Sequence, residues 1–487
     1  MKFETLTLHL AIRKPSPVHV KYGPWQNETM SVADDNRSRT PNSESFVEYM
    51  GTNWASDSAP LPAASEVAPF AAARRAAVAE RFAGHAVLIE AGPTKVRSND
   101  TEYRYRPHAA FAHLTGWGTA TVPDSVLVIA GSATLFLRPT AGKGNPEFFA
   151  NNMIGEFWVG QRPSLQAVSA LLGIETRDLA ELPEFLAAIP AEDQLTLDDP
   201  SVLEFTAELR LVKDSYEIAE MRNAVAASVA GFENIARELP KAIGHSRGER
   251  LVETAFFAKA RELGHDLGYD TISAAGAHAC TLHWVVNDGP VLDGQLILVD
   301  AGVEVDSFYT ADITRTMPVN GKFTPVQRKV YEAVLEAADA VFAMAKPGVT
   351  YSLMHDTAMA VIAKKVHEWG LLPDGVSVED SLNPDNQWHR RFMVHGTGHH
   401  LGIDVHDCAA ARRSQYKDAV LQPGMIFTIE PGLYFHPDDL LVPEELRGIG
   451  VRIEDDVLVT ETGVENLSAA LPRTVDGIEA WMARHRA

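Results

Sequence analysis

Cysteine is scarce in this chain, and its scarcity excludes several kinds of protein. Only two of the 487 residues are cysteines, Cys280 and Cys408, and no Cys-x-x-Cys motif occurs. A framework of several disulfide bonds is therefore excluded. We expect both cysteines to be buried thiols in a reducing compartment, with a single bridge between them as the alternative.

The chain also has few long apolar runs and few positively charged residues. No stretch approaches the ~20 apolar residues of a membrane-spanning helix, and Met1–Ile12 is not followed by the cleavage site of a signal peptide. Lys and Arg number 43 against 65 Asp and Glu, which gives a formal net charge of −22. This excess of negative charge argues against nucleic acid or an anionic membrane as a partner. We therefore expect a soluble cytoplasmic enzyme.

Sequence patterns divide the chain into three regions, of which the first two are residues 1–65 and 66–205. The polar stretch Ser31–Ser45 offers little to bury, which predicts a disordered or extended segment over residues 1–65. One hypothesis is that translation starts at Met30. Residues 66–205 alternate between helical and strand-like patterns, which predicts an α/β domain. The expected helices are Ala71–Phe82, Ser164–Leu172 and Leu182–Ile189, and the expected strands are Ala86–Glu90, Ser125–Ala130 and Ala133–Leu137.

Residues 206–487 are predicted to form a second, larger domain. Asp214 and Glu217 have the spacing of a capping box. They predict the start of a long helix from Ser215 to Glu238, which we expect to stop at Pro240. Helices are also expected at Glu249–Leu263, Pro325–Ala345 and Ser352–Trp369, with β segments between them.

Five potential metal ligands follow one another along this second domain. They are Asp300, Asp312, His399, Glu430 and Glu454. Four carboxylates and one imidazole form a hard, oxygen-rich set, and four negative charges balance two divalent cations. The set therefore indicates a two-metal hydrolytic centre rather than a structural zinc site.

The two aspartates are predicted to belong to one β-hairpin. The apolar run Leu296–Val299 leads into Asp300, and Asp312 follows twelve residues later. In a hairpin centred on Asp306 the two carboxylates face each other, provided that the loop has an odd length or a bulge. Two buried carboxylates side by side repel each other, and a metal ion relieves that repulsion. The alternative is a pair of aspartates in a surface turn.

Histidines concentrate in one glycine-rich segment. Four of the chain's 18 histidines fall within twelve residues after Val394, and glycines occupy positions 396, 398 and 402. Glycine permits close backbone approach and disfavours a helix, so we expect loop and strand here. A single histidine is more often a satisfied core or surface residue, but this concentration favours a functional site.

Two glutamates complete the set of ligands. Glu430 ends an apolar run and precedes Pro431-Gly432, which predicts a strand that delivers a carboxylate to a sharp turn. Alternation places Glu454 and Arg452 on the same face of another strand. The alternative for that strand is a surface salt bridge.

Together and in this order, the motifs resemble the metal-dependent pita-bread peptidases, and within them the proline-specific branch of aminopeptidase P and prolidase. In the N-terminal half, Tyr103-Arg-Tyr-Arg-Pro and the segment Phe111–Trp117 are similar to that branch's signature, and methionine aminopeptidase lacks this domain. Creatinase has a similar fold but lacks the metal ligands. The loop between the two aspartates is one residue longer than the commonest form in the family. The similar motifs of the second domain are Leu282-His283, Asp300-Ala-Gly, Asp312-Ile-Thr-Arg-Thr, His395-Gly-x-Gly-His399-x-Leu-Gly, Asp404-Val-His406-Asp, Glu430-Pro-Gly and Arg452-Ile-Glu454-Asp.

The resemblance implies a fold and a set of metal ligands. The fold class is α/β (α+β), with a creatinase-like α/β N-terminal domain followed by a pita-bread catalytic domain. Asp300 is expected to chelate one ion, and Asp312 and Glu454 to bridge two. His399 and Glu430 are expected to complete the coordination of the second ion.

The resemblance also implies roles for residues that surround the metal ions. His283, His395 and His406 are expected to position the substrate or to stabilise the transition state. Arg452 is expected to orient a ligand or the substrate. Glu430 is our candidate for carrying a proton to the leaving proline nitrogen.

The implied activity is that of an Xaa-Pro aminopeptidase. A metal-bridging hydroxide would release the N-terminal residue from peptides with proline in the second position. The hard ligand set suits Mn²⁺, although affinity alone would favour Zn²⁺ or Co²⁺. Family members are commonly dimers or tetramers, so we expect a homo-oligomer. The nearest alternative is a prolidase that cleaves Xaa-Pro dipeptides, and a more remote one is an inactive pita-bread module that binds peptides.

Overall fold

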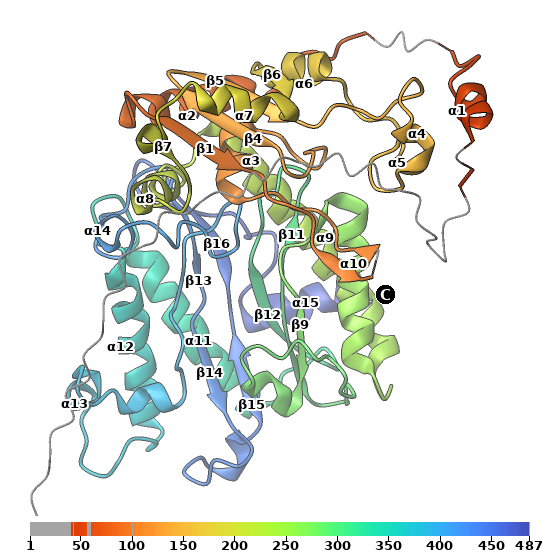
Figure 1. Ribbon diagram of the computed structural model, residues 1–487. Helices are drawn as coiled ribbons and strands as arrows, with labels where there is room; N and C mark the ends of the chain where they lie inside the picture. The colour runs from red at the N-terminus through yellow and green to blue at the C-terminus, as the bar shows by residue number, and fades with distance from the viewer. Residues whose placement is uncertain (1–39, 42, 56–59, 100, 487) are drawn as a thin grey trace, which may run out of the picture. The chain divides into compact units, whose positions relative to one another are not determined.

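The computed structural model describes residues 40–41, 43–55, 60–99 and 101–486 (Figure 1). Met30 and most of the polar stretch Ser31–Ser45 lie outside the described residues, and so does the predicted start at Met30. No helix among the described residues combines the length and the hydropathy of a membrane span. Cys280 and Cys408 are both buried free thiols, as expected, and are not joined to each other.

The chain folds into two compact units that do not follow the order of the sequence. The smaller unit gathers Pro139–Ser164, Ala180–Ala188 and the described residues up to position 55. Its helices are α1 (Glu44–Met50), α4 (Glu147–Ala150), α5 (Glu156–Val159) and α7 (Leu182–Ala187). Helix α1 falls within residues 1–65, for which the sequence predicts a disordered or extended segment. Its Phe46 packs edge-on against Phe149, with ring centroids 5.3 Å apart, so this helix has an apolar partner that local composition does not reveal.

The larger unit begins with a five-stranded sheet in the order β6-β5-β4-β1-β7. Strands β1, β4 and β5 are antiparallel neighbours, whereas β6 and β7 add to the two edges in parallel. The strands are β1 (Ala86–Glu90), β4 (Val126–Ala130), β5 (Ser132–Leu137), β6 (Glu175–Asp178) and β7 (Gln194–Leu195), and a short ribbon is formed by β2 (Val96–Ser98) and β3 (Thr101–Glu102). The helices of this part are α2 (Ala68–Arg81), α3 (Ala109–Thr115), α6 (Leu165–Leu172) and α8 (Pro200–Glu208). Phe111 and Trp117 lie in the apolar core beneath the sheet.

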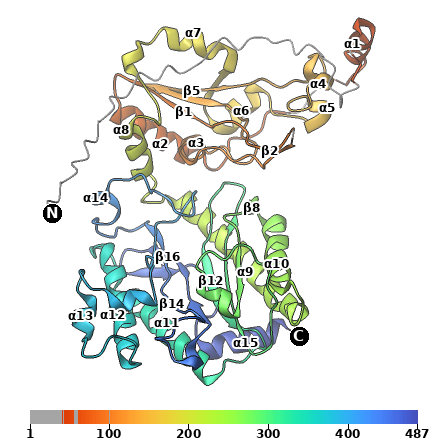
Figure 2. The same ribbon diagram turned by 60° about the horizontal axis from the view of Figure 1, so that its bottom comes forward.

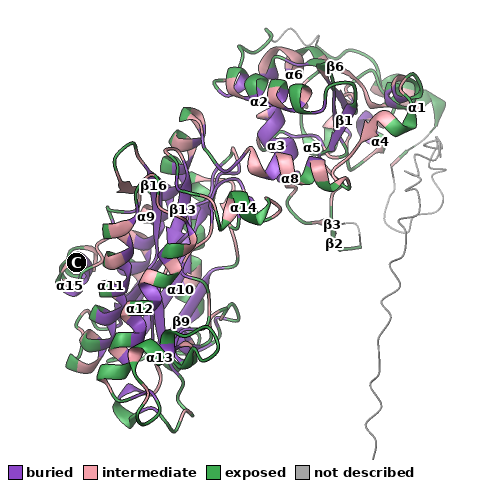
Figure 3. Ribbon diagram, turned by 90° about the vertical axis from the view of Figure 1, so that its left-hand side faces the viewer, coloured by how far each residue is buried: buried purple, intermediate pink, exposed green. Residues whose placement is uncertain are grey.

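The remainder of the larger unit is a second core in which helix pairs cover short, buried strands. Helices α9 and α10 form one pair, α11 and α12 the other, and Figure 3 shows that the strands between them are buried. The helices are α9 (Ser215–Ala242), α10 (Gly248–Leu263), α11 (Pro325–Met344), α12 (Ser352–Glu368), α13 (Val378–Leu382), α14 (Arg413–Tyr416) and α15 (Val475–His485). The strands are β8 (Asp266–Leu267), β9 (Ile272–Ala275), β10 (Leu296–Ala301), β11 (Val303–Glu304), β12 (Ile313–Pro318), β13 (Ile426–Ile429), β14 (Gly432–Phe435), β15 (Ile449–Arg452), β16 (Asp455–Val459) and β17 (Val464–Asn466).

These strands pair into several small sheets (Figure 2). The three-stranded sheets have the orders β12-β10-β9 and β13-β16-β17, and β14 pairs with β15. Glu454 lies in the break between β15 and β16 rather than inside one strand. The prediction of a single strand here is therefore wrong, because the chain passes at this point from pairing with β14 to pairing with β13.

Helix α9 begins as predicted but ends later. The side chains of Asp214 and Glu217 each accept a backbone N–H of the other residue, which completes the predicted capping box. Pro240 does not stop the helix, which continues to Ala242. Proline removes its own N–H bond and crowds the carbonyl four residues earlier, but the fully buried Leu239 and Ala242 on either side stabilise the last turn.

The hairpin that carries the two aspartates has a register other than the one predicted. Asp300 lies opposite Thr314, so Asp312 is its diagonal neighbour on the same face instead of its direct partner. The turn is centred on Ser307, because the Val305 N–H donates to the Tyr309 carbonyl around a three-residue loop. The expected odd-length loop is confirmed, and Phe308 closes it in the left-handed region with φ of 70°.

We predict that Gly302→Ala destabilises the protein strongly. A Cβ at this position would overlap the carbonyl oxygen of Ala311 on the facing strand, so the hairpin between the aspartates would have to open. The expected loss in the free energy of unfolding is about 3 kcal/mol, measured by urea denaturation. Gly463→Ala is the control, because nothing lies within 4 Å of its Cβ position. Equal stability of the two variants would contradict the prediction.

Candidate metal centre

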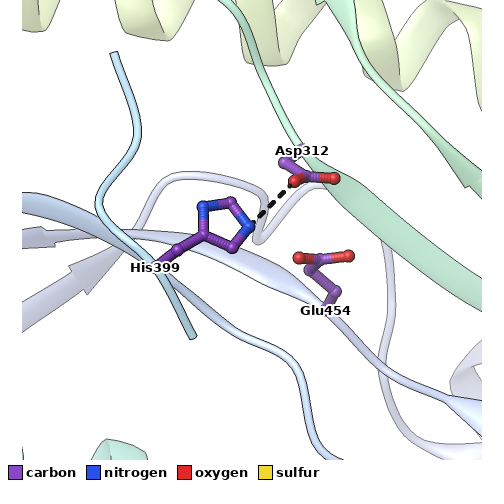
Figure 4. A group of neighbouring side chains, drawn as sticks. All are labelled: Asp312, His399 and Glu454. Atoms are coloured by element: carbon purple, nitrogen blue, oxygen red, sulfur yellow. Dashed lines mark ion pairs between the residues drawn. The ribbon is translucent and has the colours of Figure 1, made fainter. Parts of the chain in front are cut away.

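Three of the predicted ligands converge on one point. Asp312 directly precedes β12, His399 lies in the glycine-rich loop, and Glu454 lies between β15 and β16. One ligand atom from each lies within 4.8 Å of the others, and Figure 4 shows the three side chains directed toward one another. The carboxylates of Asp312 and Glu454 are buried. This spacing and donor set suit a divalent cation.

The imidazole of His399 is oriented for coordination through one nitrogen. Nδ1 lies 3.2 Å from the backbone carbonyl oxygen of His400, to which it donates. Nε2 is thereby left to face the carboxylates, 3.2 Å from Asp312 Oδ2 and 3.8 Å from Glu430 Oε1. A backbone partner that fixes the tautomer is the usual arrangement behind a metal-binding histidine.

Asp300 is connected to the cluster through Tyr269. The buried Tyr269 hydroxyl contacts Oδ1 of Asp300 at 2.7 Å and also Oδ1 of Asp312. The other oxygen of Asp300 accepts a hydrogen bond from Arg452 Nη2. The two aspartates therefore belong to one site, although they are diagonal neighbours in the hairpin.

The carboxylates of this centre raise one another's pKa. Burial, with a contribution from Asp312 and against the effect of His399, raises the pKa of Glu430 to about 7. Burial also raises the pKa of Glu454 well above its usual value, and the neighbouring Asp312 and Glu430 add to the shift. The pKa of Asp300 is raised by burial and by Asp312, although the nearby Arg452 lowers it. Cations placed among these groups would remove the repulsion, so the residues present fit divalent metal ions.

A second hydrogen-bonded chain extends from Arg452 to His395. Arg452 Nη1 donates to the Tyr434 hydroxyl at 3.1 Å, and that hydroxyl donates to His395 Nε2 at 2.8 Å. Burial, with the nearby Arg452, lowers the pKa of His395 to about 3. His395 is therefore neutral, and its Nδ1 lies 3.5 Å from Glu430 Oε2.

His283 and His406 are the predicted site residues that are exposed to solvent. The His406 ring meets that of His399 edge-on at 4.3 Å between centroids. Burial lowers the pKa of His406, and neighbouring His399 and His283 lower it further, so His283 is close enough to interact. The structure thus places His406 against His399, with His283 close to His406.

Comparison with known proteins places this arrangement in a family. The pattern of metallopeptidase family M24 matches residues 219–461, and that of the aminopeptidase P N-terminal domain matches residues 71–197. The chain is 46% identical over 467 residues to Xaa-Pro aminopeptidase 1 of Streptomyces coelicolor, covering 91% of this chain and 92% of that protein. The chain belongs to metallopeptidase family M24.

Solved structures agree with this assignment. Zinc-substituted Escherichia coli aminopeptidase P in complex with product has a TM-score of 0.75 at 30% identity, covering 87% of this chain and all of that one. Pseudomonas aeruginosa aminopeptidase PepP has a TM-score of 0.74 at 31% identity, and the match covers 86% of this chain and 98% of that one. The predicted fold class is confirmed: an aminopeptidase P N-terminal domain precedes an M24 pita-bread domain. The boundaries at residues 65 and 205 stay a prediction.

This M24 peptidase also uses residues that the sequence did not single out. Tyr269 bridges Asp300 and Asp312, and the Thr314 hydroxyl donates to Glu454 Oε2 at 2.7 Å. Tyr434 stands beside a predicted ligand in the Glu430-Pro-Gly-Leu-Tyr motif, which is the only local signal for it. Tyr269 has no such signal, because its partners lie 31 and 43 residues away in the sequence.

We predict that the metal-free M24 peptidase loses stability as the pH rises from 6 to 9. The pKa of Glu430 is about 7 in the folded protein, above its ordinary 4.5. Its protonated form therefore stabilises the fold at low pH, and that stability is lost as the pH rises through 7. Burial lowers the pKa of His399, but the bond with Asp312 outweighs it and raises the pKa from 6.5 to about 9. The stability that protonated His399 contributes is complete below pH 6.5 and is lost as the pH rises through 9. Calorimetry of the chelated protein should show a falling Tm.

Bound metal should reverse that trend, because metal ions require the deprotonated ligands. The same scan with saturating Mn²⁺ is therefore the control. A Tm of the chelated protein that rises between pH 6 and 9 would contradict the assignment of these groups to one repulsive cluster.

Proposed function

We propose that this chain is an Xaa-Pro aminopeptidase, which removes the N-terminal residue from peptides with proline in the second position. The convergence of Asp312, His399 and Glu454 supports hydrolysis at a metal centre. The proline preference is supported by full-length similarity to relatives that carry this name in Streptomyces coelicolor and Escherichia coli. The Escherichia coli relative is 33% identical, covering 85% of this chain and 97% of that protein.

The centre is proposed to hold two Mn²⁺ ions. Asp300, Asp312, His399, Glu430 and Glu454 would hold these ions. Oxygen-rich donors support manganese, and four carboxylates match the charge of two divalent ions. When bound, such ions would supply an activated water and polarise the scissile carbonyl.

The protein's own groups would then handle protons and charge. Glu430 would accept a proton from the attacking water and deliver it to the proline nitrogen as the amide breaks. The exposed His283 and His406 would donate N–H groups to the oxyanion that develops on the carbonyl. Neutral His395, held by Tyr434, would contact the substrate beside Glu430.

Arg452 would act on the ligands rather than on the substrate. Its guanidinium joins Asp300 to Tyr434 and is fully enclosed by the surrounding strands. It would thus fix the carboxylate of Asp300 in one orientation. Proline supplies no N–H and a fixed φ, so the substrate must be bound through its first residue and its carbonyl groups.

We predict cleavage of an Xaa-Pro-Yaa tripeptide by the Mn²⁺-loaded protein. The matching Xaa-Pro dipeptide and an Xaa-Ala-Yaa tripeptide are run beside it, and EDTA should abolish release of the first residue. Cleavage of the dipeptide alone would make the protein a prolidase. A metal-loaded protein that cleaves neither proline peptide would contradict the proposed substrate class. Titration of metal-free protein should reach two equivalents of Mn²⁺.

We predict that Glu430→Gln folds but loses turnover. The amide keeps the size of the side chain yet cannot carry the proton, so kcat should fall by about 10²- to 10⁴-fold. Circular dichroism and Mn²⁺ titration separate this effect from loss of fold or of metal. Near-native kcat in this variant would remove Glu430 from its proposed role.

A further inference from the structure

Arg106, in the N-terminal part of the larger unit, contacts two distant segments at once. Its Nε donates to Glu304 Oε2 at 2.6 Å, and its Nη2 donates to the backbone carbonyl of Ile403 at 2.5 Å. Its Nη1 lies 3.1 Å from Asp404 Oδ1. The same guanidinium lies over the ring of Phe308, 5.6 Å from its centroid. Arg106 belongs to the Tyr103-Arg-Tyr-Arg-Pro motif, for which the proposed chemistry has no use.

The contacted residues lie between predicted metal-site residues. Glu304 and Phe308 are in the hairpin between Asp300 and Asp312, which we call the aspartate hairpin (residues 300–312). Ile403 and Asp404 are in the histidine loop (residues 399–407), between His399 and His406. One backbone bond also joins the two segments, from the Thr310 N–H to the Gly402 carbonyl at 2.9 Å. Arg106 therefore spans the two segments that must meet for Asp312 and His399 to share an ion.

The charges around Arg106 make the contact hard to replace. Burial raises the pKa of Glu304 to about 7 even though Arg106 opposes the shift. Glu304 is nearly inaccessible, whereas Asp404 is partly exposed. Loss of the guanidinium would leave a buried carboxylate without its cation and a loop carbonyl without its donor. Lysine could not satisfy both, because its single ammonium lacks the planar fork of arginine.

We propose that Arg106 is a positioning residue, through which the N-terminal domain holds the aspartate hairpin and the histidine loop together. It reaches the chemistry only through other residues, by keeping Asp312 and His399 convergent and His406 directed at the site. The effect on turnover rests on the proposed function, whereas the effects on metal binding and loop mobility do not. The motif that marks this family's N-terminal domain thereby acquires a physical role.

Arg104, two residues earlier, supplies a matched control. It donates from Nη1 to the His265 carbonyl at 2.9 Å, and its Nε lies 2.9 Å from Asp266 Oδ2. It thus has a carboxylate and a carbonyl as partners, as Arg106 does, but both lie outside the aspartate hairpin and the histidine loop. Its side chain is also more exposed.

The test compares Arg106→Met, Arg106→Lys and Arg104→Met with the wild type. Hydrogen exchange is followed in peptides that cover residues 302–311 and 399–407, and Mn²⁺ binding is measured by titrating metal-free protein. Arg106→Met should exchange faster in both segments, bind Mn²⁺ more weakly, and lower kcat on an Xaa-Pro-Yaa tripeptide by about 10- to 100-fold. The exchange rates, Mn²⁺ affinity and kcat of Arg106→Lys should lie between those of Arg106→Met and the wild type. Those of Arg104→Met should match the wild type.

Two results would overturn the proposal. One is an Arg106→Met protein with wild-type exchange in both segments and wild-type Mn²⁺ affinity. The other is an exchange increase that extends equally to the α11–α12 pair, which would mark a general loss of stability. If Arg106→Met does not fold, Arg106→Lys decides by the same criterion of local exchange. Should the wild type fail to cleave the tripeptide, the proposed function fails, while exchange and metal binding still decide the role of Arg106.

A double variant separates positioning from simple charge neutralisation. Glu304→Gln removes the buried negative charge that faces Arg106. If Arg106 serves only to neutralise it, Arg106→Met combined with Glu304→Gln should recover wild-type exchange and metal affinity, which would overturn the proposal. Persistent mobility confined to the histidine loop would support it, because the Ile403 carbonyl and Asp404 would still lack their partner.

Discussion

Repulsion among buried carboxylates is the constraint on which the rest of this structure depends. Asp300, Asp312, Glu430 and Glu454 are enclosed together, and their pKa values show the cost: those of Asp300, Glu430 and Glu454 shift upward. A protein keeps such a group only when something compensates it. Tyr269, Thr314 and Arg452 supply donors from the protein side. The metal ions of an M24 peptidase supply the remaining positive charge.

The fold concentrates these groups by ending several small sheets at one place. Asp300 lies one residue before the end of β10, Glu430 follows β13, and Glu454 occupies the break where the chain leaves β15 for β16. Glu430 and Glu454 therefore stand where backbone pairing stops, so their side chains can face the centre while the adjoining strands are fixed by their ladders. The flanking helix pairs bury the strands (Figure 3).

Contacts from outside the catalytic core bear on the same geometry. Arg106 fixes the histidine loop against the aspartate hairpin, and Arg74 pairs with Asp214 at the N-terminal cap of α9. Both arginines come from the part of the chain that precedes the catalytic core. Such contacts give the N-terminal domain a mechanical connection to the centre that requires no direct contact with substrate.

Local sequence determined the elements and the donor set: the capping box at Asp214, the apolar run before Asp300 and the glycine-rich histidine loop are readable because their signals lie within a few residues. Resemblance added the pita-bread fold and the proposed roles. Tertiary structure alone decided the diagonal register of Asp300 and Asp312, the break beside Glu454, the passage of α9 through Pro240, and the roles of Tyr269 and Arg106. Those features depend on partners tens to hundreds of residues away, which no local pattern of side chains encodes.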